Sequence, residues 1–140
     1  MVYVDTSVIV ALLTVEPKTQ DVTAWFAGLR DAPTCSDWLL TEFHSAISIK
    51  LRTRQISAAN AKRVRKAFEL LVDGGLRMVP VSRAAFSQAA IMTQQHAHGL
   101  HAGDSLHLAV ALELGASHMA SLDETLAANA QRNGMDLVGL

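Results

Sequence analysis

Short apolar segments alternate with helical patterns along the whole chain, and this alternation restricts the fold more than any other feature of the sequence. The expected strands cover residues 2–5, 34–36, 76–81, 117–122 and 135–138. The expected helices cover residues 6–13, 19–29, 38–53, 58–72, 83–95, 104–114 and 125–132. Strands that alternate with helices form a parallel sheet whose two faces are covered. We therefore predict an α/β fold, a three-layer α/β/α sandwich with a central parallel sheet of four to five short strands, in one domain over residues 1–140.

The composition narrows the class of protein. Half of the residues are apolar, enough for a core, and the formal net charge of −1 points neither to nucleic acid nor to a membrane. Cys35 is the single cysteine, so no internal disulfide can form, which fits a reducing compartment. No apolar run approaches the roughly 20 residues that span a bilayer. No basic region precedes the first apolar run, as it would in a secretion signal. We expect a cytoplasmic protein.

Acidic residues follow two of the expected strands, and two more lie near the starts of helices. Asp5 ends the first strand and Asp123 ends the fourth. Glu42 lies about one turn into the helix after the second strand, and that helix begins at the same edge of the sheet. Asp104 opens the helix before the fourth strand and joins this edge if the helix runs antiparallel to the strand. Because the carboxyl ends of parallel strands share one edge, the pattern predicts that the acids meet there.

Four converging carboxylates need a compensating charge. Each like-charged pair at about 4 Å costs roughly 4 kcal/mol at an effective dielectric constant of about 20. Protons or a cation must offset this cost, and a site of oxygen ligands suits a hard cation, Mg²⁺ or Mn²⁺. Such ions, singly or in pairs, activate water and stabilise the leaving oxygen in phosphodiester cleavage. The acids therefore predict metal-dependent hydrolysis of phosphodiester bonds.

Simpler roles stay open for the individual residues. Asp104 and Asp123 are also good helix caps, and Glu42 could be a solvated helix residue. Thr6 and Ser7 could simply start the first helix, or they could be auxiliary hydroxyls that position water or phosphate beside a metal-bound acid. Few roles other than function place an acid at the end of the first buried strand, so Asp5 is the strongest single indication of a functional site.

Four segments resemble the acidic motifs of PIN domains, in the same order and at the same spacing. The opening Met1–Leu13, with its strand, Asp, Thr and Ser, looks like the start of these domains. The other three segments are Thr41-Glu42-Phe43, Ala102-Gly103-Asp104-Ser105-Leu106-His107-Leu108-Ala109 and Ser121-Leu122-Asp123-Glu124-Thr125-Leu126. The resemblance covers the chain from end to end. At this compact size the chain looks like the VapC-type toxins of bacterial toxin–antitoxin modules.

This resemblance implies a Mg²⁺- or Mn²⁺-dependent endoribonuclease, the toxin of a toxin–antitoxin system, that cuts single-stranded or structured RNA loops. Metal-activated water would be held by the four carboxylates and would leave 5′-phosphate and 3′-hydroxyl ends. By match of position, the catalytic, metal-binding acids are Asp5, Glu42, Asp104 and Asp123. Ser7 occupies an auxiliary polar position of the family. The resemblance also implies a homodimer and a cognate antitoxin protein whose peptide tail enters the active-site groove.

Other functions compete with this interpretation. A catalytically silent PIN-like interaction domain is one alternative, which the presence of all four acids disfavours. An aspartyl-phosphate hydrolase also opens with a strand and an Asp, but it needs a second Asp two residues later, where this chain has Ser7. A receiver domain needs paired acids early in the chain and a Lys after a later strand, and neither is present. Asp37, an extra acid near the second strand, departs from the PIN pattern and has no assigned role.

The histidines near the third acidic motif allow two further hypotheses. His96, His98 and His101 suggest zinc, but their spacing is not a standard one and no Cys accompanies them, so a polar loop is favoured. His107 lies three residues after Asp104 on the same helical face. It either orients that carboxylate or is a buried, hydrogen-bonded core residue, and we favour the second role.

Basic residues gather in one stretch between Glu42 and Glu69, where no acid intervenes. Seven of the twelve Lys and Arg residues lie there: Lys50, Arg52, Arg54, Lys62, Arg63, Arg65 and Lys66. On a nearly neutral protein such a cluster is a candidate surface for the RNA backbone. It could equally be the solvated face of a helix pair, or it could meet an acidic segment of the antitoxin.

Overall fold

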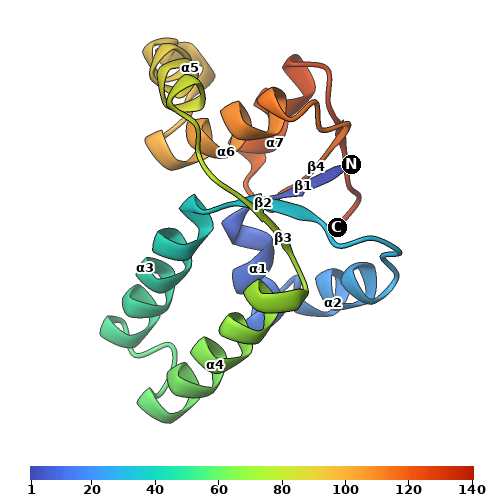
Figure 1. Cartoon of the computed structure of the whole chain (residues 1–140). Helices are drawn as coiled ribbons and strands as arrows, with labels where there is room; N and C mark the ends of the chain where they lie inside the picture. Colours follow the sequence, from blue (N-terminus) through green and yellow to red (C-terminus); the bar gives the residue numbers. More distant parts are fainter.

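The computed structural model describes all 140 residues, and its centre is a five-stranded parallel sheet with strand order β3-β2-β1-β4-β5 (Figure 1). The strands are short: β1 (Val2–Val4), β2 (Thr34–Ser36), β3 (Arg77–Val79), β4 (His118–Ala120) and β5 (Asp136–Leu137). β1 lies between β2 and β4 and pairs with both in parallel. The predicted parallel sheet is confirmed, and the first strand of the sequence is its central strand.

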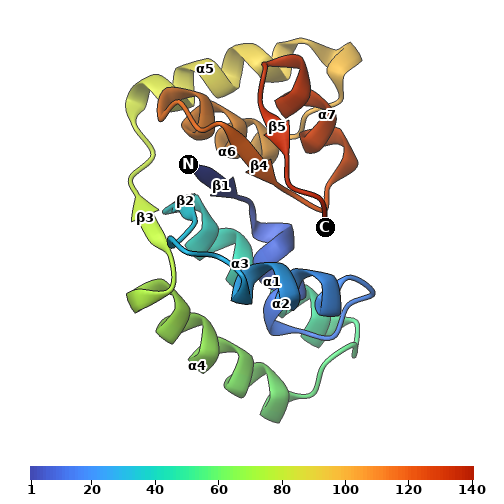
Figure 2. The same ribbon diagram turned by 90° about the vertical axis from the view of Figure 1, so that its right-hand side faces the viewer.

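Seven α-helices cover the two faces of the sheet (Figures 1 and 2). One face carries α1 (Thr6–Leu13), α2 (Thr19–Ala27), α3 (Trp38–Arg52) and α4 (Ala58–Gly74). The other face carries α5 (Arg83–Gln94), α6 (Ala102–Glu113) and α7 (Glu124–Arg132). The 3₁₀ turn η1 (His96–His98) joins α5 to α6. This is the predicted three-layer α/β/α sandwich. A membrane crossing would need a longer or more apolar helix than any that the chain forms.

Successive residues of β1 point to opposite faces of the sheet and enter two separate cores. Tyr3 packs in the core under α5, α6 and α7, whereas Val4 packs in the core under α1 to α4. α6 is buried over seven consecutive residues, Ser105–Ala111, because its sequence is apolar almost all round. In the other core the rings of Phe43 and Phe68 stack with their centroids 3.8 Å apart, which joins α3 to α4.

β4 is shorter than the sequence pattern predicts, covering His118–Ala120 rather than residues 117–122. A parallel strand continues only as far as its neighbour can pair with it, and β1 ends at Val4. β3 is shortened in the same way against β2. Asp123 therefore lies in the connection to α7, not at the last residue of a strand.

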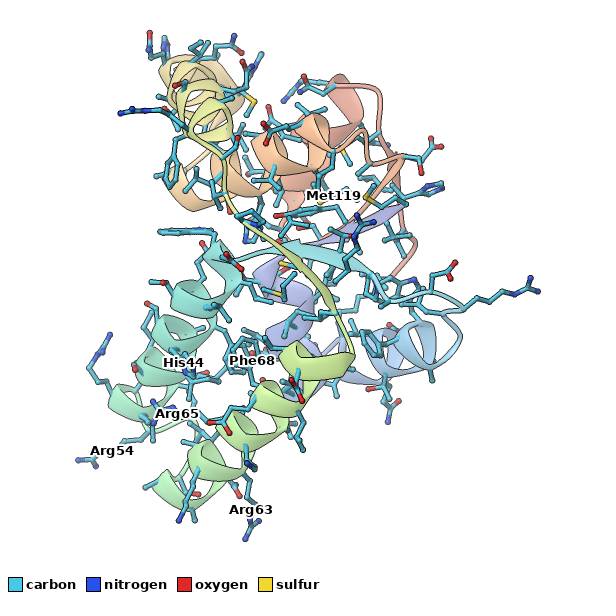
Figure 3. The ribbon with its side chains drawn as sticks, viewed as in Figure 1. His44, Arg54, Arg63, Arg65, Phe68 and Met119 are labelled. Carbon is cyan, nitrogen blue, oxygen red and sulfur yellow. The ribbon has the colours of Figure 1, made fainter.

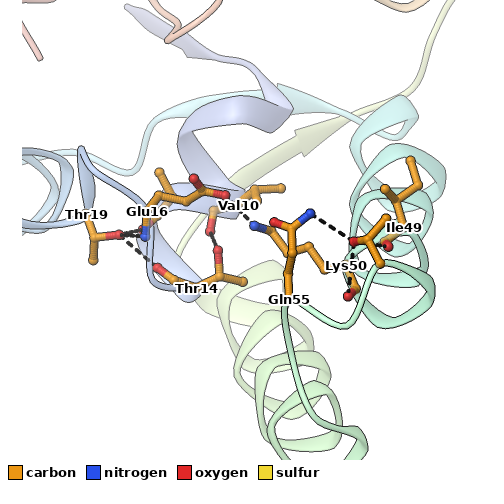
Figure 4. A network of polar contacts seen from close by, with 9 residues as sticks. Val10, Thr14, Glu16, Thr19, Ile49, Lys50 and Gln55 are labelled. Carbon is orange, nitrogen blue, oxygen red and sulfur yellow. Dashed lines mark hydrogen bonds and ion pairs between the residues drawn. The ribbon is translucent and has the colours of Figure 1, made fainter.

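A polar network fixes the loop between α1 and α2 against the end of α3 (Figure 4). The Thr14 hydroxyl donates to the Val10 carbonyl at 2.7 Å, and the Thr19 hydroxyl accepts from the Glu16 N–H at 2.8 Å. The Glu16 carboxylate then forms an ion pair with Lys50 of α3. The network holds α1 and α3 in a fixed relation, and both helices border the site described next.

Candidate active site

The carboxyl edge of the sheet holds a cavity of about 420 Å³. All four acids predicted from the sequence line it: Asp5, Glu42, Asp104 and Asp123. The other lining residues are Thr6, Ser7, Trp38, Thr41, Ser45, Ala46, Ile49 and His107. Neither Lys nor Arg lines the cavity, so no permanent positive charge faces the carboxylates.

Asp5 directly follows the central strand and is buried, with 3% of its surface exposed. Its carboxylate caps α1 by accepting from the Val8 N–H at 3.3 Å. It also accepts from the hydroxyls of Ser7 at 2.6 Å and Ser121 at 2.8 Å. Burial raises the pKa of Asp5, because desolvation outweighs the charge of His107 and these hydrogen bonds. Negative charge on Asp5 is therefore costly unless a cation offsets it.

Two serine hydroxyls join the end of β1 to the connection that carries the fourth acid. Ser7 Oγ accepts from the Leu122 N–H at 2.9 Å, and Ser121 Oγ accepts from the Asp123 N–H at 3.0 Å. Asp123 caps α7 with Oδ1, which accepts from the Leu126 N–H at 2.7 Å, while its Oδ2 accepts no hydrogen bond. Asp123 is thus a helix cap that also lines the cavity.

Glu42 lies one turn into α3, and two side chains fix its carboxylate. Its Oε2 accepts from Thr6 Oγ1 at 2.5 Å and lies 2.7 Å from His107 Nε2. Partial burial acts to raise the pKa of Glu42, but the hydrogen bond and charge of His107, with the contacts of Thr6 and Trp38, outweigh it, so the pKa is lowered. Glu42 is therefore the acid whose ionised form the surrounding side chains favour.

Asp104 lies in the first turn of α6 and makes none of the hydrogen bonds that hold the other acids. Burial raises the pKa of Asp104, and the negative charges of Asp123, Glu42 and Asp5 raise it further. The acids are thus close enough to repel one another. A cation would relieve this repulsion.

The structure gives His107 a different partner from the one that helical spacing suggested. Its imidazole hydrogen-bonds to Glu42, not to Asp104, and its Nδ1 lies 3.0 Å from the Tyr3 hydroxyl oxygen. The favoured interpretation, a buried and hydrogen-bonded histidine, is confirmed. Helical periodicity compares residues of one helix, whereas Glu42 is on α3, so the sequence held no direct signal for this contact.

Other residues singled out in the sequence do not line the acidic cavity. Asp37 is exposed and does not line the cavity. The three loop histidines, His96, His98 and His101, are exposed as well. No group of three or more His, Cys, Asp or Glu side chains is arranged as a ready metal centre, either in this loop or among the acids.

Gly103 allows α6 to approach α3 closely. A Cβ at this position would collide with Glu42 Oε1 and would lie 3.1 Å from Trp38 Nε1. Glycine is an unfavourable residue inside a helix, so its presence in the first turn is the sequence signal that could have revealed this contact. The absence of a side chain at Gly103 thus leaves room for the carboxylate of Glu42.

A second cavity, of about 520 Å³, adjoins the acidic one. The two share four lining residues: Thr6, Ser7, Ala46 and Ile49. Both partners of the ion pair between Lys50 and Glu16 also line the second cavity. A groove therefore runs from the acids along α1 and α3.

The basic cluster surrounds the connection between α3 and α4. Arg52 lies ten residues after Glu42 on the same helix, about 15 Å along its axis, since a helix rises about 1.5 Å per residue. Figure 3 shows Arg54 and Arg63 pointing away from the ribbon near this connection. The cluster therefore lies at the far end of α3 from the acids.

Two lysines of the cluster already have acidic partners. Lys50, with 13% of its side chain exposed, pairs with Glu16. Lys66 forms an exposed ion pair with Glu69 at 3.4 Å. The other five basic side chains form no ion pair: Arg52, Arg54, Lys62, Arg63 and Arg65.

The fold and the cavity define a class, α/β/α proteins whose parallel sheet carries an acidic site at its carboxyl edge. The chain belongs to the PIN domain family, whose model matches residues 2–132. The matched range includes all four acids and confirms the resemblance seen in the sequence. No curated protein sequence matches the chain.

Solved structures share this fold. VapC20 of Mycobacterium tuberculosis, described as a toxin that cleaves the sarcin–ricin loop, gives a TM-score of 0.74 at 18% identity over 92% of this chain and 95% of that one. FitAcB from Neisseria gonorrhoeae gives a TM-score of 0.74 at 18% identity, over 99% of this chain and 97% of that one. VapBC2 from Rickettsia felis, in a structure bound to a DNA fragment from its promoter, gives a TM-score of 0.64 at 14% identity, over 99% of this chain and 98% of that one. At these identities the likeness shows a common fold.

Proposed function

We propose that this chain is a metal-dependent endoribonuclease and the toxin of a toxin–antitoxin system. The main support is the cavity in which four carboxylates meet with no Lys or Arg among the lining residues. Such an excess of negative charge repels an RNA phosphate unless a cation lies between them. Membership of the PIN domain family and the toxin that cleaves the sarcin–ricin loop, a fold relative, support the same proposal.

The donor atoms fit a hard cation. Asp104 makes no hydrogen bond and Asp123 Oδ2 accepts none, while Glu42 Oε1 has only the Trp38 indole N–H beside it, so oxygens from three acids can take a ligand. Carboxylate oxygens are the ligands that Mg²⁺ and Mn²⁺ prefer. Mg²⁺ usually keeps several waters and takes only one or two carboxylates directly, which suits acids that form no ready metal centre on their own. We assign one or two ions of Mg²⁺ or Mn²⁺ to these acids and Asp5.

A bound cation would supply a Lewis acid that lowers the pKa of water and offsets the charge of the scissile phosphate. The pKa values of Asp5 and Asp104 are both raised, which suits a group that takes the proton of the attacking water, and Asp104 is the one of the two that makes no hydrogen bond. The water oxygen bonds to phosphorus, and the bond between phosphorus and the 3′ oxygen breaks. That oxygen then gains a proton, which gives 5′-phosphate and 3′-hydroxyl ends.

Thr6 and Ser7 support this chemistry indirectly. Thr6 donates to Glu42 and Ser7 donates to Asp5, so both hydroxyls fix acids and also border the groove. Ser7 takes the place of the second Asp that an aspartyl-phosphate hydrolase needs, and its hydroxyl is already held by the Leu122 N–H. The proposed role of both hydroxyls is therefore to hold the acids in place.

The toxin role implies a cognate antitoxin protein, an RNA substrate, a homodimer and a cytoplasmic location. The solved structure of VapBC2 holds a bound DNA fragment, in keeping with a protein that takes part in a larger assembly. In this chain the groove beside the acids offers room for a peptide tail of the antitoxin, next to the proposed metal site.

Incubation of the purified, antitoxin-free chain with a mixed RNA pool tests the proposal. RNA should be cut in Mn²⁺ or Mg²⁺ and left intact in EDTA, because the four acids need a cation. The ends of the products should be 5′-phosphate and 3′-hydroxyl. A histidine-based ribonuclease would instead leave a cyclic phosphate and would ignore EDTA.

Two outcomes would contradict the nuclease proposal. No metal-dependent cleavage of any RNA would favour a catalytically silent PIN-like interaction domain. Hydrolysis of a phosphomonoester such as p-nitrophenyl phosphate, without RNA cleavage, would favour an aspartyl-phosphate hydrolase.

Changing Arg54, Lys62 and Arg63 together to Gln should weaken RNA binding without impairing metal binding. Each lost phosphate contact should reduce the slope of log affinity against log salt concentration by about 0.7, the value for single strands. Fluorescence anisotropy with a labelled RNA over a series of salt concentrations, in Ca²⁺ or without metal to prevent cutting, measures this slope.

The matched control is Lys66→Gln, because the ammonium of Lys66 already pairs with Glu69. This variant should bind RNA with nearly the slope of the wild type. If the triple variant also keeps the wild-type slope, the connection between α3 and α4 is a solvated face and RNA binds elsewhere.

A further inference from the structure

His107 is a polar residue in α6, the helix that is buried over seven consecutive residues. It is 1% exposed, and its neighbours Leu106 and Leu108 are buried core residues. Burying an imidazole is costly unless its nitrogens find partners. Both nitrogens have them, since Nδ1 lies 3.0 Å from the Tyr3 hydroxyl and Nε2 lies 2.7 Å from Glu42 Oε2. A leucine would satisfy the core at this position, so the polar contacts need their own explanation.

The partners determine where the hydrogen of His107 lies. A carboxylate only accepts hydrogen bonds, so Nε2 must carry the hydrogen that bonds to Glu42. The phenol of Tyr3 can donate to a bare Nδ1 or accept from a protonated one, so the neutral ring with hydrogen on Nε2 makes this contact too. A doubly protonated ring would carry the same hydrogen on Nε2. In both forms the ring donates to Glu42.

Tyr3 is likewise more polar than packing requires. It is fully buried in β1 between Val2 and Val4, where a phenylalanine would fill the same space. Its ring meets that of His107 edge to face, with the centroids 5.8 Å apart. The hydroxyl thus links the central strand to the imidazole and limits the rotation of that ring.

Glu42 receives two hydrogen bonds on the same oxygen. Thr6 Oγ1 donates to Oε2 at 2.5 Å, and His107 donates to it from the opposite core. These contacts hold Oε2 in place, and Oε1 lies beside the buried indole N–H of Trp38, which has no other partner. That oxygen lies where a side chain on Gly103 would collide with it, at the junction of α3 and α6.

We propose that Tyr3 and His107 form a positioning pair that holds Oε2 of Glu42 and so keeps Oε1 available to the cation, an inference that rests on the proposed metal site. Tyr3 orients the His107 ring, and the ring holds Oε2 so that only Oε1 is left for a ligand. Partners of this kind fix the orientation of metal ligands, and their loss typically lowers metal affinity about 10–100-fold. Both residues act through Glu42 and are positioning residues, not catalytic ones.

Titration calorimetry of Mn²⁺ into the full chain, without RNA, tests this pair. His107→Leu keeps the core apolar but removes the donor, and it should raise the Kd for Mn²⁺ about 10–100-fold. Tyr3→Phe keeps the packing and removes one hydrogen bond, and it should raise the Kd about threefold to tenfold. His107→Gln, which offers an N–H at a similar reach, should recover part of the loss.

A double-mutant cycle separates positioning from loss of structure. In the Glu42→Gln background, His107→Leu should cause no further loss of Mn²⁺ affinity, because its effect passes through Glu42. His96→Asn, which changes an exposed histidine, is the control and should bind Mn²⁺ as the wild type does. Thermal unfolding identifies any variant that fails to fold, and in that case Tyr3→Phe decides the question.

The outcomes distinguish the two proposals. If the wild type binds Mn²⁺ and cuts RNA, but His107→Leu and Tyr3→Phe bind Mn²⁺ equally well, the positioning pair is wrong and the nuclease stands. The positioning pair would also be wrong if His107→Leu lowered Mn²⁺ affinity by the same factor in the wild type and in the Glu42→Gln background. If the wild type binds no Mn²⁺ at all, the proposed function fails and the pair fails with it.

Discussion

Replacing Asp5 with Asn should lower the rate of RNA cleavage at least about a hundredfold, while the protein stays folded. Loss of an outer partner of a metal ligand costs about 10–100-fold, so loss of a charged ligand should cost at least the upper end of this range. Asn keeps the size of the side chain, removes its negative charge and replaces the oxygen that accepts from Ser121 with an NH2 group. Asp5 is also the acid that the central strand positions most directly.

The fold should survive because Asn can take over the structural role of Asp5. Asn caps helices as well as Asp does, so the contact with the Val8 N–H can persist. Burial raises the pKa of Asp5 in the folded protein. Such a carboxyl makes the folded protein less stable as the pH rises through its raised pKa. An amide does not ionise. At neutral pH the variant should therefore unfold at the same temperature as the wild type or at a higher one.

Single-turnover cleavage of one RNA from the pool, beside thermal unfolding of both proteins, measures the two effects. The matched control is Asp37→Asn, because Asp37 is an exposed acid just before α3 that does not line the cavity. The control should cleave at the wild-type rate. Wild-type cleavage by Asp5→Asn would instead remove this residue from the site.

The meeting of the acids could be predicted because it depends on local patterns and on topology. A strand that ends on Asp5 and a helix that begins near Glu42 must present both at one edge of a parallel sheet. The position of Asp104 depended on the direction of α6, which no local pattern determines. The structure brings Asp104 to the same cavity as the others.

The contacts that hold the acids could not be predicted, since they join distant parts of the chain. Glu42 and His107 are 65 residues apart, and their hydrogen bond depends on how closely α3 packs against α6. The same holds for the charged residues. The sequence revealed the basic cluster, but the ion pair of Lys50 with Glu16, 34 positions earlier, depends on how the chain folds. Periodicity describes one element at a time and says nothing of such pairs.

Replacing Gly103 with Ala should also lower cleavage about a hundredfold, although alanine is the better helix former. The new Cβ would collide with Glu42 Oε1 and would approach Trp38 Nε1 to 3.1 Å. Glu42 cannot turn aside freely, because Thr6 and His107 hold its other oxygen. Either these hydrogen bonds break or α6 moves away from α3. A displacement of about 1 Å can cost about 10²-fold in rate.

Gly74→Ala is the matched control for this substitution, because Gly74 also lies in a helix and has open space where a Cβ would be. Alanine at this position should raise the free energy of unfolding by about 0.4–1 kcal/mol and leave cleavage unchanged. Gly103→Ala should lose activity and Mn²⁺ affinity without this gain in stability. If Gly103→Ala instead resembles Gly74→Ala, more stable and fully active, then Glu42 adjusts at no cost and its fixed position is not needed for cleavage.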